Sequence, residues 1–113
     1  HADDEALGCA GTIARHIRNG DKVFGVSMTN GVGSRGTENN DEIKRRAQAA
    51  TNASKILGME WVEGGSFPDN AMDTVALLEV AKVIEQAKSK IKPKEYGLCS
   101  YIPLPFISLL WPL

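Results

Sequence analysis

The sequence predicts an α/β domain built on a parallel sheet. Three segments with helical periodicity alternate with short runs of apolar and β-branched residues. Helices of about fifteen residues between short strands have the length that right-handed crossovers need in a parallel sheet. The chain has 113 residues, which is enough for one small domain.

The first helix is expected over roughly Glu5 to Asn19. Acidic residues occupy its first turn, where they suit the positive end of the helix dipole. Gly20 follows as the stop. Gly8 and Gly11 lower the helix propensity, so we expect them to permit close packing on the sheet. The apolar stripe at helical spacing consists of Ala6, Ala10, Ile13, Ala14 and Ile17.

Two strands and a second helix follow. The mostly apolar run from Val23 to Thr29 predicts an interior strand. Glycine and polar residues make Asn30 to Asn40 a predicted loop. The second helix is expected from about Asp41 to Leu57. Met59 to Val62 is a candidate for the next strand, and Glu63 to Ala71 is a predicted loop.

The third helix is expected over roughly Asp73 to Ile91, with lysines at its C-terminal end, where they suit the dipole. Its predicted inward face consists of Leu77, Ala81, Ile84, Ala87 and Ile91. Residues 1–95 are expected to form the domain. Residues 96–113 differ in composition: they form an uncharged, apolar tail that three prolines interrupt, which makes a poor membrane span.

The net charge and the two cysteines argue against some classes of function and indicate a cellular location. A net charge of -1 argues against a nucleic-acid-binding face and against binding to anionic membranes. Cys9 and Cys99 do not amount to a disulfide framework, so a reducing, cytoplasmic location is expected. Acidic residues stand where a signal peptide would carry basic ones. The chain starts with His rather than Met, and we expect that a segment upstream is missing.

Candidate site residues follow from the expected sheet. In parallel sheets, ligands bind beyond the carboxyl ends of the strands. That rule selects His1 to Glu5, Thr29 to Asn40, and Glu63 to Ala71. An imidazole and a carboxylate three residues apart, at His1 and Asp4, can bind the same cation. The spacing alone leaves a second interpretation open, in which the acidic residues only complement the helix dipole.

The first thirteen residues, His1 to Ile13, resemble the signature of the LmbE-like, or PIG-L, zinc-dependent deacetylases. The usual form of that signature is His-Pro-Asp-Asp-Glu followed by a helix of small residues, and Ala2 takes the place of the proline. The resemblance covers roughly Glu5 to Pro93 as well as the motif. It continues through Thr29-Asn30-Gly31, Arg45-Arg46, Leu57-Gly58, Phe67-Pro68-Asp69-Asn70 and Met72-Asp73.

The resemblance implies a Rossmann-like, three-layer α/β fold and hydrolysis of an N-acetyl group on an N-acetylglucosaminyl conjugate, with Zn²⁺ as the cofactor. By this resemblance His1 and Asp4 bind zinc, and Asp3 is the general base. The residues that match the family's substrate-binding positions are Arg46, Asp69 and Asn70. A small sugar conjugate is then the expected partner, and the sequence is compatible with a homo-oligomer.

The sequence departs from the family after Glu95. The family takes its third zinc ligand from a histidine-rich segment after a strand that would begin near Tyr96. No histidine follows His16, which lies twelve residues beyond Asp4, or roughly 18 Å along a helix. We therefore expect a truncated domain of impaired activity, with its first strand missing and its C-terminal part missing or replaced. A reading-frame change near Lys94 would explain the tail.

An alternative is a non-catalytic α/β binding or receiver-like module. Receiver domains also place an acidic pair after the first strand, where it holds Mg²⁺. His1 argues against that interpretation, because imidazole is a poor ligand for Mg²⁺. A dinucleotide-binding domain is excluded, because the glycines from Gly31 to Gly36 have the wrong spacing. A role in which the apolar tail docks on a partner is the remaining alternative.

Overall fold

A computed structural model describes residues 1–29, 31 and 40–95. Its elements are, in order, α1 (Asp4–Arg18), β1 (Phe24–Val26), α2 (Asn40–Leu57), β2 (Glu60–Val62), the 3₁₀ turn η2 (Met72–Thr74) and α3 (Leu77–Ile91). Most of the predicted loop at Asn30–Asn40 and all of the predicted tail at Tyr96–Leu113 lie outside the described residues. The alternation of helices and strands confirms the predicted α/β class.

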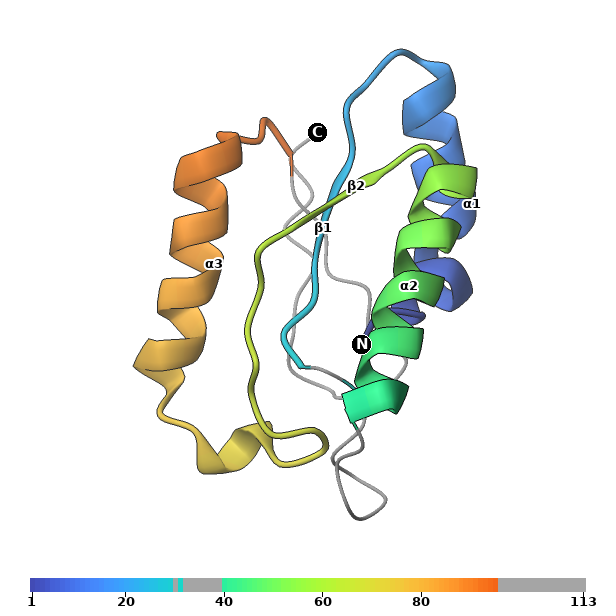
Figure 1. The fold of residues 1–113 in the computed structure, drawn as a ribbon. Helices are drawn as coiled ribbons and strands as arrows, with labels where there is room; N and C mark the ends of the chain where they lie inside the picture. The colour runs from blue at the N-terminus through green and yellow to red at the C-terminus, as the bar shows by residue number, and fades with distance from the viewer. Residues whose placement is uncertain (30, 32–39, 96–113) are drawn as a thin grey trace.

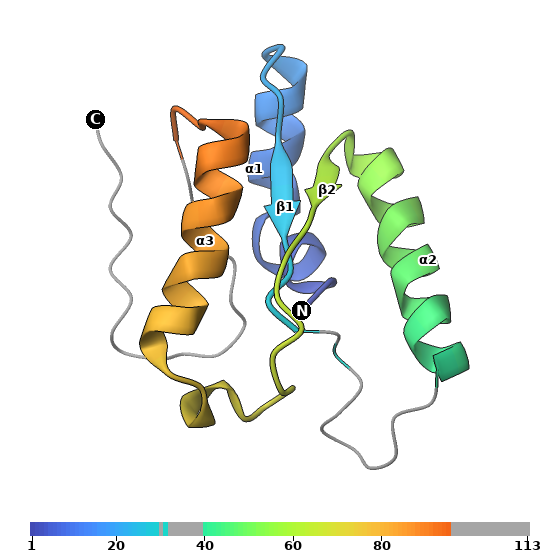
Figure 2. The same cartoon turned by 60° about the vertical axis from the view of Figure 1, so that its left-hand side comes forward.

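The described strands form a two-stranded parallel sheet. Figures 1 and 2 show α3 on one side of the strands and α2 on the other, with α1 beside α2 in the first view. The register pairs Phe24 with Glu60 and Val26 with Val62. Both strands are shorter than predicted, but a further parallel bridge joins Thr29 to Phe67. The carboxyl ends of the strands therefore lie at one edge.

The junction between α2 and β2 contacts both α1 and α2. Gly58 ends α2 in the left-handed region (φ +78°), and the side chain of Ile17 from α1 packs close to it. The indole Nε1 of Trp61 donates a hydrogen bond to the carbonyl of Ala50 in α2 (3.1 Å). Met59, between them, is one of the most buried apolar residues. These contacts fix β2 against α2.

Helix α1 differs from the predicted straight helix. Its backbone leaves helical geometry at Cys9 (φ −145°, ψ 18°), between Gly8 and Gly11, whose low helix propensity favours a kink there. The expectation that Gly11 permits close packing is wrong for the described residues, because a Cβ added there would meet none of them within 4 Å. Cys9 is disulfide-bonded, which the sequence analysis did not predict.

Helix α3 begins later than predicted, at Leu77, because the chain at Asp73 forms the separate 3₁₀ turn and is extended at Val75. The predicted inward face is only partly correct. Ala87 is buried, but Leu77 is 81% exposed and Ile84 is 47% exposed. A narrow sheet covers one line of a helix surface, so the broad apolar face predicted for this helix is not buried within the described part of the chain.

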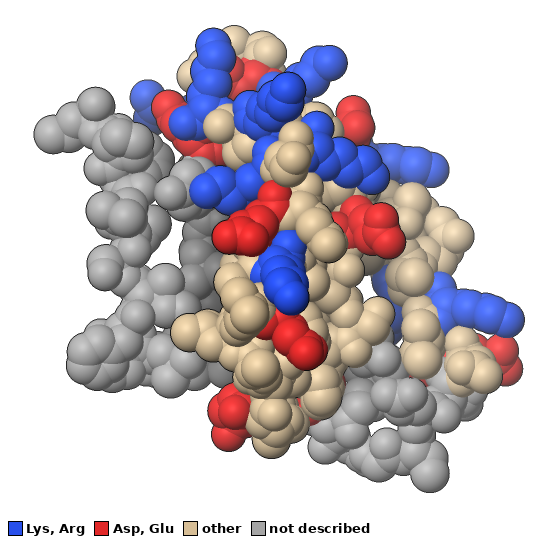
Figure 3. Space-filling model, turned by 90° about the vertical axis from the view of Figure 1, so that its left-hand side faces the viewer, with Lys and Arg blue, Asp and Glu red and all other residues tan. Residues whose placement is uncertain are grey.

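The lysines predicted at the C-terminal end of α3 are confirmed. Lys88 and Lys90 lie in its last turn, and Lys92 caps the helix in the left-handed conformation. Figure 3, which faces α3, shows basic side chains gathered over the upper end of the molecule. Among the described helices, none combines the length and the apolar character needed to cross a bilayer.

A substitution at Gly64 tests the close approach of the two strand ends. A Cβ at Gly64 would lie 1.9 Å from the carbonyl oxygen of Ser27, which is backbone and cannot rotate away. We expect Gly64→Ala to lower the free energy of unfolding by about 1–3 kcal/mol. In contrast, Gly11→Ala should raise it by about 1 kcal/mol, since helix propensity improves without a clash. Denaturant unfolding of both variants measures the difference; equal stabilities would contradict the packing at Gly64.

Candidate metal centre

Two chain segments far apart in sequence run together beyond the strands. The amide of Gly65 donates to the carbonyl of Ser27 (2.9 Å), and the amide of Phe67 donates to that of Met28 (3.1 Å). A tight turn follows, in which the amide of Ala71 reaches the carbonyl of Pro68 (3.4 Å). The segment after β2 is therefore carried alongside the segment after β1, as the parallel-sheet rule predicts.

The N-terminal motif forms a compact group of donor atoms. His1, Asp3 and Asp4 each offer one ligand atom, and these atoms all lie within 4.8 Å of one another. The described residues contain no other such group of three. The α-amino group of His1 also donates to Asp4 Oδ2 (2.6 Å). The structure thus brings together the three residues that the sequence assigned to metal binding and base catalysis.

Helix capping does not account for Asp3. This residue is the N-cap of α1, yet its side chain makes no capping hydrogen bond. An aspartate at this position usually accepts a hydrogen bond from the helix backbone, because the first turn has unpaired amides. Here the carboxylate is exposed beside His1 and Asp4 instead. This observation weakens the interpretation in which the acidic pair serves only the helix.

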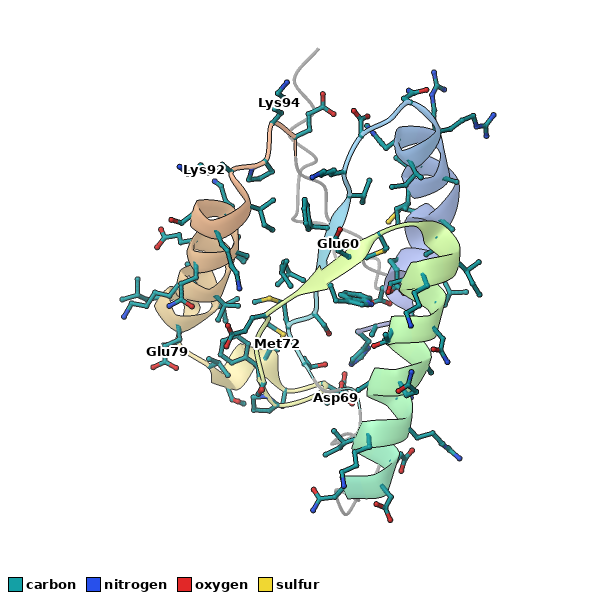
Figure 4. The ribbon with its side chains drawn as sticks, turned by 45° about the horizontal axis from the view of Figure 1, so that its top comes forward. Glu60, Asp69, Met72, Glu79, Lys92 and Lys94 are labelled. Atoms are coloured by element: carbon teal, nitrogen blue, oxygen red, sulfur yellow. The ribbon has the colours of Figure 1, made fainter. Side chains whose placement is uncertain are left out.

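Asp69 reaches the motif from the loop after β2. Its Oδ1 contacts Nε2 of His1, across 68 residues of sequence. The side chain of Asp69 is only 2% exposed, whereas that of His1 is 40% exposed. Figure 4 shows Asp69 at the end of the molecule opposite Lys92 and Lys94. The predicted third segment therefore meets the first in a direct side-chain contact.

Arg46 also lies at this site. A side chain added at Gly31 would meet Arg46 Nη1 at 3.0 Å and His1 Cδ2 at 3.4 Å, so both groups flank this glycine. Asn70 is exposed and adopts the left-handed conformation (φ +55°) in the turn that follows Asp69. His16 lies far along α1 and contacts Asp21 through Nδ1 (2.8 Å), as expected of a residue that flanks the helix.

The sequence did not predict that Glu5 would be buried. It is 7% exposed, and its Oε2 has no hydrogen-bond partner within the described part of the chain. Thr29 Oγ1 is buried and unpartnered in the same sense. The sequence carries no clear signal for this burial, because the kink at Cys9 breaks the helical spacing between Glu5 and the buried Ile13. Glu5 thus places a third acidic side chain directly after Asp3 and Asp4, and this one is buried.

Comparison with known families decides the assignment. The sequence model of the family described as PIG-L, GlcNAc-PI de-N-acetylase, matches residues 1–95. The chain belongs to the PIG-L family. This confirms the resemblance seen in the motif and indicates a deacetylase-type function for this PIG-L chain. It disfavours the receiver-like alternative. No solved structure was found to match the chain.

The donor set of this PIG-L chain fits a divalent metal ion. The imidazole of His1 and the carboxylate of Asp4 are ligand types that Zn²⁺ accepts, and Asp3 adds a second carboxylate within 4.8 Å of both donor atoms. Next to this group, Oε2 of Glu5 is buried without a hydrogen-bond partner among the described residues. Residues 96–113, where the resemblance would lead one to expect a histidine-rich segment, lie outside the described part of the chain and contain no histidine.

Metal binding predicts a measurable gain in stability. A ligand that binds only the folded chain stabilises it by about 2.7 kcal/mol at roughly 100 times its Kd. We expect Zn²⁺ to raise the melting temperature of the chain, and a chelator to reverse the shift. Asp4→Asn should abolish most of this shift, whereas Glu79→Gln, an exposed substitution on α3, should retain it. An equal shift in both variants would exclude Asp4 as a ligand.

Proposed function

We propose that this chain is a zinc-dependent hydrolase that removes an acetyl group from a sugar conjugate of the N-acetylglucosamine type. The observation that carries the proposal is the group of donor atoms from His1, Asp3 and Asp4, all within 4.8 Å of one another, in a chain of the PIG-L family. Its position beyond the carboxyl ends of parallel strands is the usual place for a ligand site.

His1 and Asp4 are the proposed zinc ligands. Their spacing of three residues spans the entry to α1, so the helix start holds both donors in one place. A bound zinc ion supplies Lewis-acid chemistry: it lowers the pKa of water and polarises the carbonyl of the acetamide. The carboxylate of Asp4 contributes negative charge, and the imidazole of His1 contributes a neutral donor.

Asp3 is the proposed general base. Its carboxylate is exposed, makes no capping hydrogen bond, and lies beside both proposed ligands. It can therefore take the proton from the water that attacks the acetamide carbonyl. The same carboxyl group, now protonated, can pass this proton to the departing amine nitrogen, so that a free amine and acetate are released.

Arg46, Asp69 and Asn70 are the proposed substrate-binding residues. The guanidinium of Arg46 offers several N–H donors beside His1 at Gly31, which suits a phosphate or the hydroxyls of a sugar. Asn70 is exposed and can donate to or accept from a sugar hydroxyl. The carboxylate of Asp69 is almost fully covered, so its contribution depends on its contact with His1.

We also propose that residues 1–95 are part of a larger Rossmann-like, three-layer domain. The parallel pairing of β1 with β2 and the helices on both sides of the strands support this view. The family's first strand would precede His1, and its third zinc ligand would follow Glu95.

The base assignment is tested by Asp3→Asn. The chain supplied with Zn²⁺ should release acetate from an N-acetylglucosaminyl substrate, and this variant should reduce the rate by roughly 10²- to 10⁴-fold while it still binds Zn²⁺. Asp73→Asn removes the same charge from the exposed 3₁₀ turn and should keep the wild-type rate. If Asp3→Asn is fully active, also in a chain extended at both ends, Asp3 is not the base.

Adjacent arginines provide a matched test of substrate binding. Arg46 flanks Gly31 together with His1, whereas Arg45 is an exposed neighbour on α2. Loss of a hydrogen bond to a charged group costs about 1.5–3 kcal/mol, which is about tenfold or more in kcat/KM. We expect Arg46→Ala to show this loss through a raised KM, and Arg45→Ala to show little change. A similar loss in both variants would indicate a general charge effect.

A further inference from the structure

We infer that Asp69 is a positioning residue: its buried carboxylate accepts a hydrogen bond from Nε2–H of His1 and thereby turns Nδ1 of the same ring toward the metal ion. The inference rests on the proposed function, because it names the ring nitrogen that would bind the cation. It assigns Asp69 a role that acts through His1 rather than through direct contact with the substrate.

The argument begins with the two nitrogens of an imidazole. A carboxylate is only an acceptor when ionised, so the contact between Asp69 Oδ1 and His1 Nε2 requires a proton on Nε2. A protonated ring nitrogen cannot bind a metal ion. Nδ1 is therefore the nitrogen left to bind the cation together with Asp4, whose carboxylate belongs to the same group of donor atoms as His1.

A carboxylate in this position has two effects on a histidine ligand. It fixes the tautomer and the orientation of the ring, and it makes the opposite nitrogen more basic. Both effects are strongest where the hydrogen bond is shielded from water. The side chain of Asp69 is 2% exposed, whereas the imidazole of His1 is 40% exposed. The anchor is thus buried, and the imidazole that it orients still reaches solvent.

The backbone holds Asp69 firmly in this place. Two residues earlier, the amide of Phe67 donates to the carbonyl of Met28 (3.1 Å). On the other side, the left-handed backbone of Asn70 (φ +55°) reverses the chain. The carboxylate is therefore positioned before any metal ion binds, so little further ordering is needed on binding.

The burial of Asp69 also separates its role from that of its neighbours. A sugar hydroxyl would have to reach a carboxylate that is almost fully covered. Arg46 and Asn70 are exposed and can meet a substrate directly. The structure therefore favours an arrangement in which exposed residues contact the sugar and Asp69 acts through His1.

The first experiment needs no metal. In ¹⁵N-labelled, metal-free protein, the Nε2–H proton of His1 should give an observable, downfield-shifted signal, because its hydrogen bond slows exchange with water. The signal should vanish in Asp69→Ala and persist in Asp73→Ala, the matched control. Asp69→Asn, which keeps an acceptor oxygen, should retain it in part. Absence of the signal in the wild-type chain, or its survival in Asp69→Ala, would overturn the inference.

The second experiment adds Zn²⁺ and follows the ¹⁵N shifts of His1 together with the affinity. Zinc should shift the Nδ1 resonance and leave Nε2 protonated. Asp69→Ala should bind Zn²⁺ roughly 10- to 100-fold more weakly, with the folded state verified by its circular dichroism. Zinc on Nε2 would overturn the inference. If the wild-type chain bound no zinc, the proposed function would fail, while the metal-free signal would still decide the role of Asp69.

Discussion

The close parallel approach of the segments after β1 and β2 is the constraint on which the candidate site depends. The hydrogen bonds from Gly65 to Ser27 and from Phe67 to Met28 extend the pairing beyond the short sheet. Only a glycine fits at position 64, where a Cβ would overlap the carbonyl of Ser27. This pairing carries Asp69 from the far side of the sequence to His1. Without it, the N-terminal motif would stand alone at the start of a helix.

The sequence predicted the positions of the helices well, but it predicted less well which face of each helix is buried. Helical periodicity located α1, α2 and most of α3, because their caps and stops are local signals. The inward face of α3 was partly wrong, since which side of a helix is covered depends on how many strands lie beside it. Leu77 is exposed for this reason, and nothing in the local sequence distinguishes it from Ala87. Burial of that kind is a property of the assembled fold.

For the site as well, local spacing in the sequence predicted some of the contacts, whereas others depend on the assembled fold. The proximity of His1 and Asp4 could be predicted from the sequence, because both residues lie at or just before the start of one helix. The rule for parallel sheets selected the loop that contains Asp69, but it could not specify a partner for the carboxylate. That contact depends on the register between two loops, fixed by the pairing of Thr29 with Phe67. Arg46 of α2 comes near His1 because both side chains flank Gly31, which also depends on the assembled fold.

The charges of the clustered carboxylates favour the binding of a cation at the site. Asp3, Asp4 and Asp69 come within reach of one imidazole, and Glu5 is buried one residue further on. Carboxylates gathered in this way repel one another, and a bound cation relieves that repulsion. Their roles still differ because their exposure differs: a buried carboxylate can hold a ring in place, whereas an exposed one can exchange protons with a substrate and water. If the proposed roles hold, metal affinity and reaction rate should be lost independently in this fold, the former through Asp69 and the latter through Asp3.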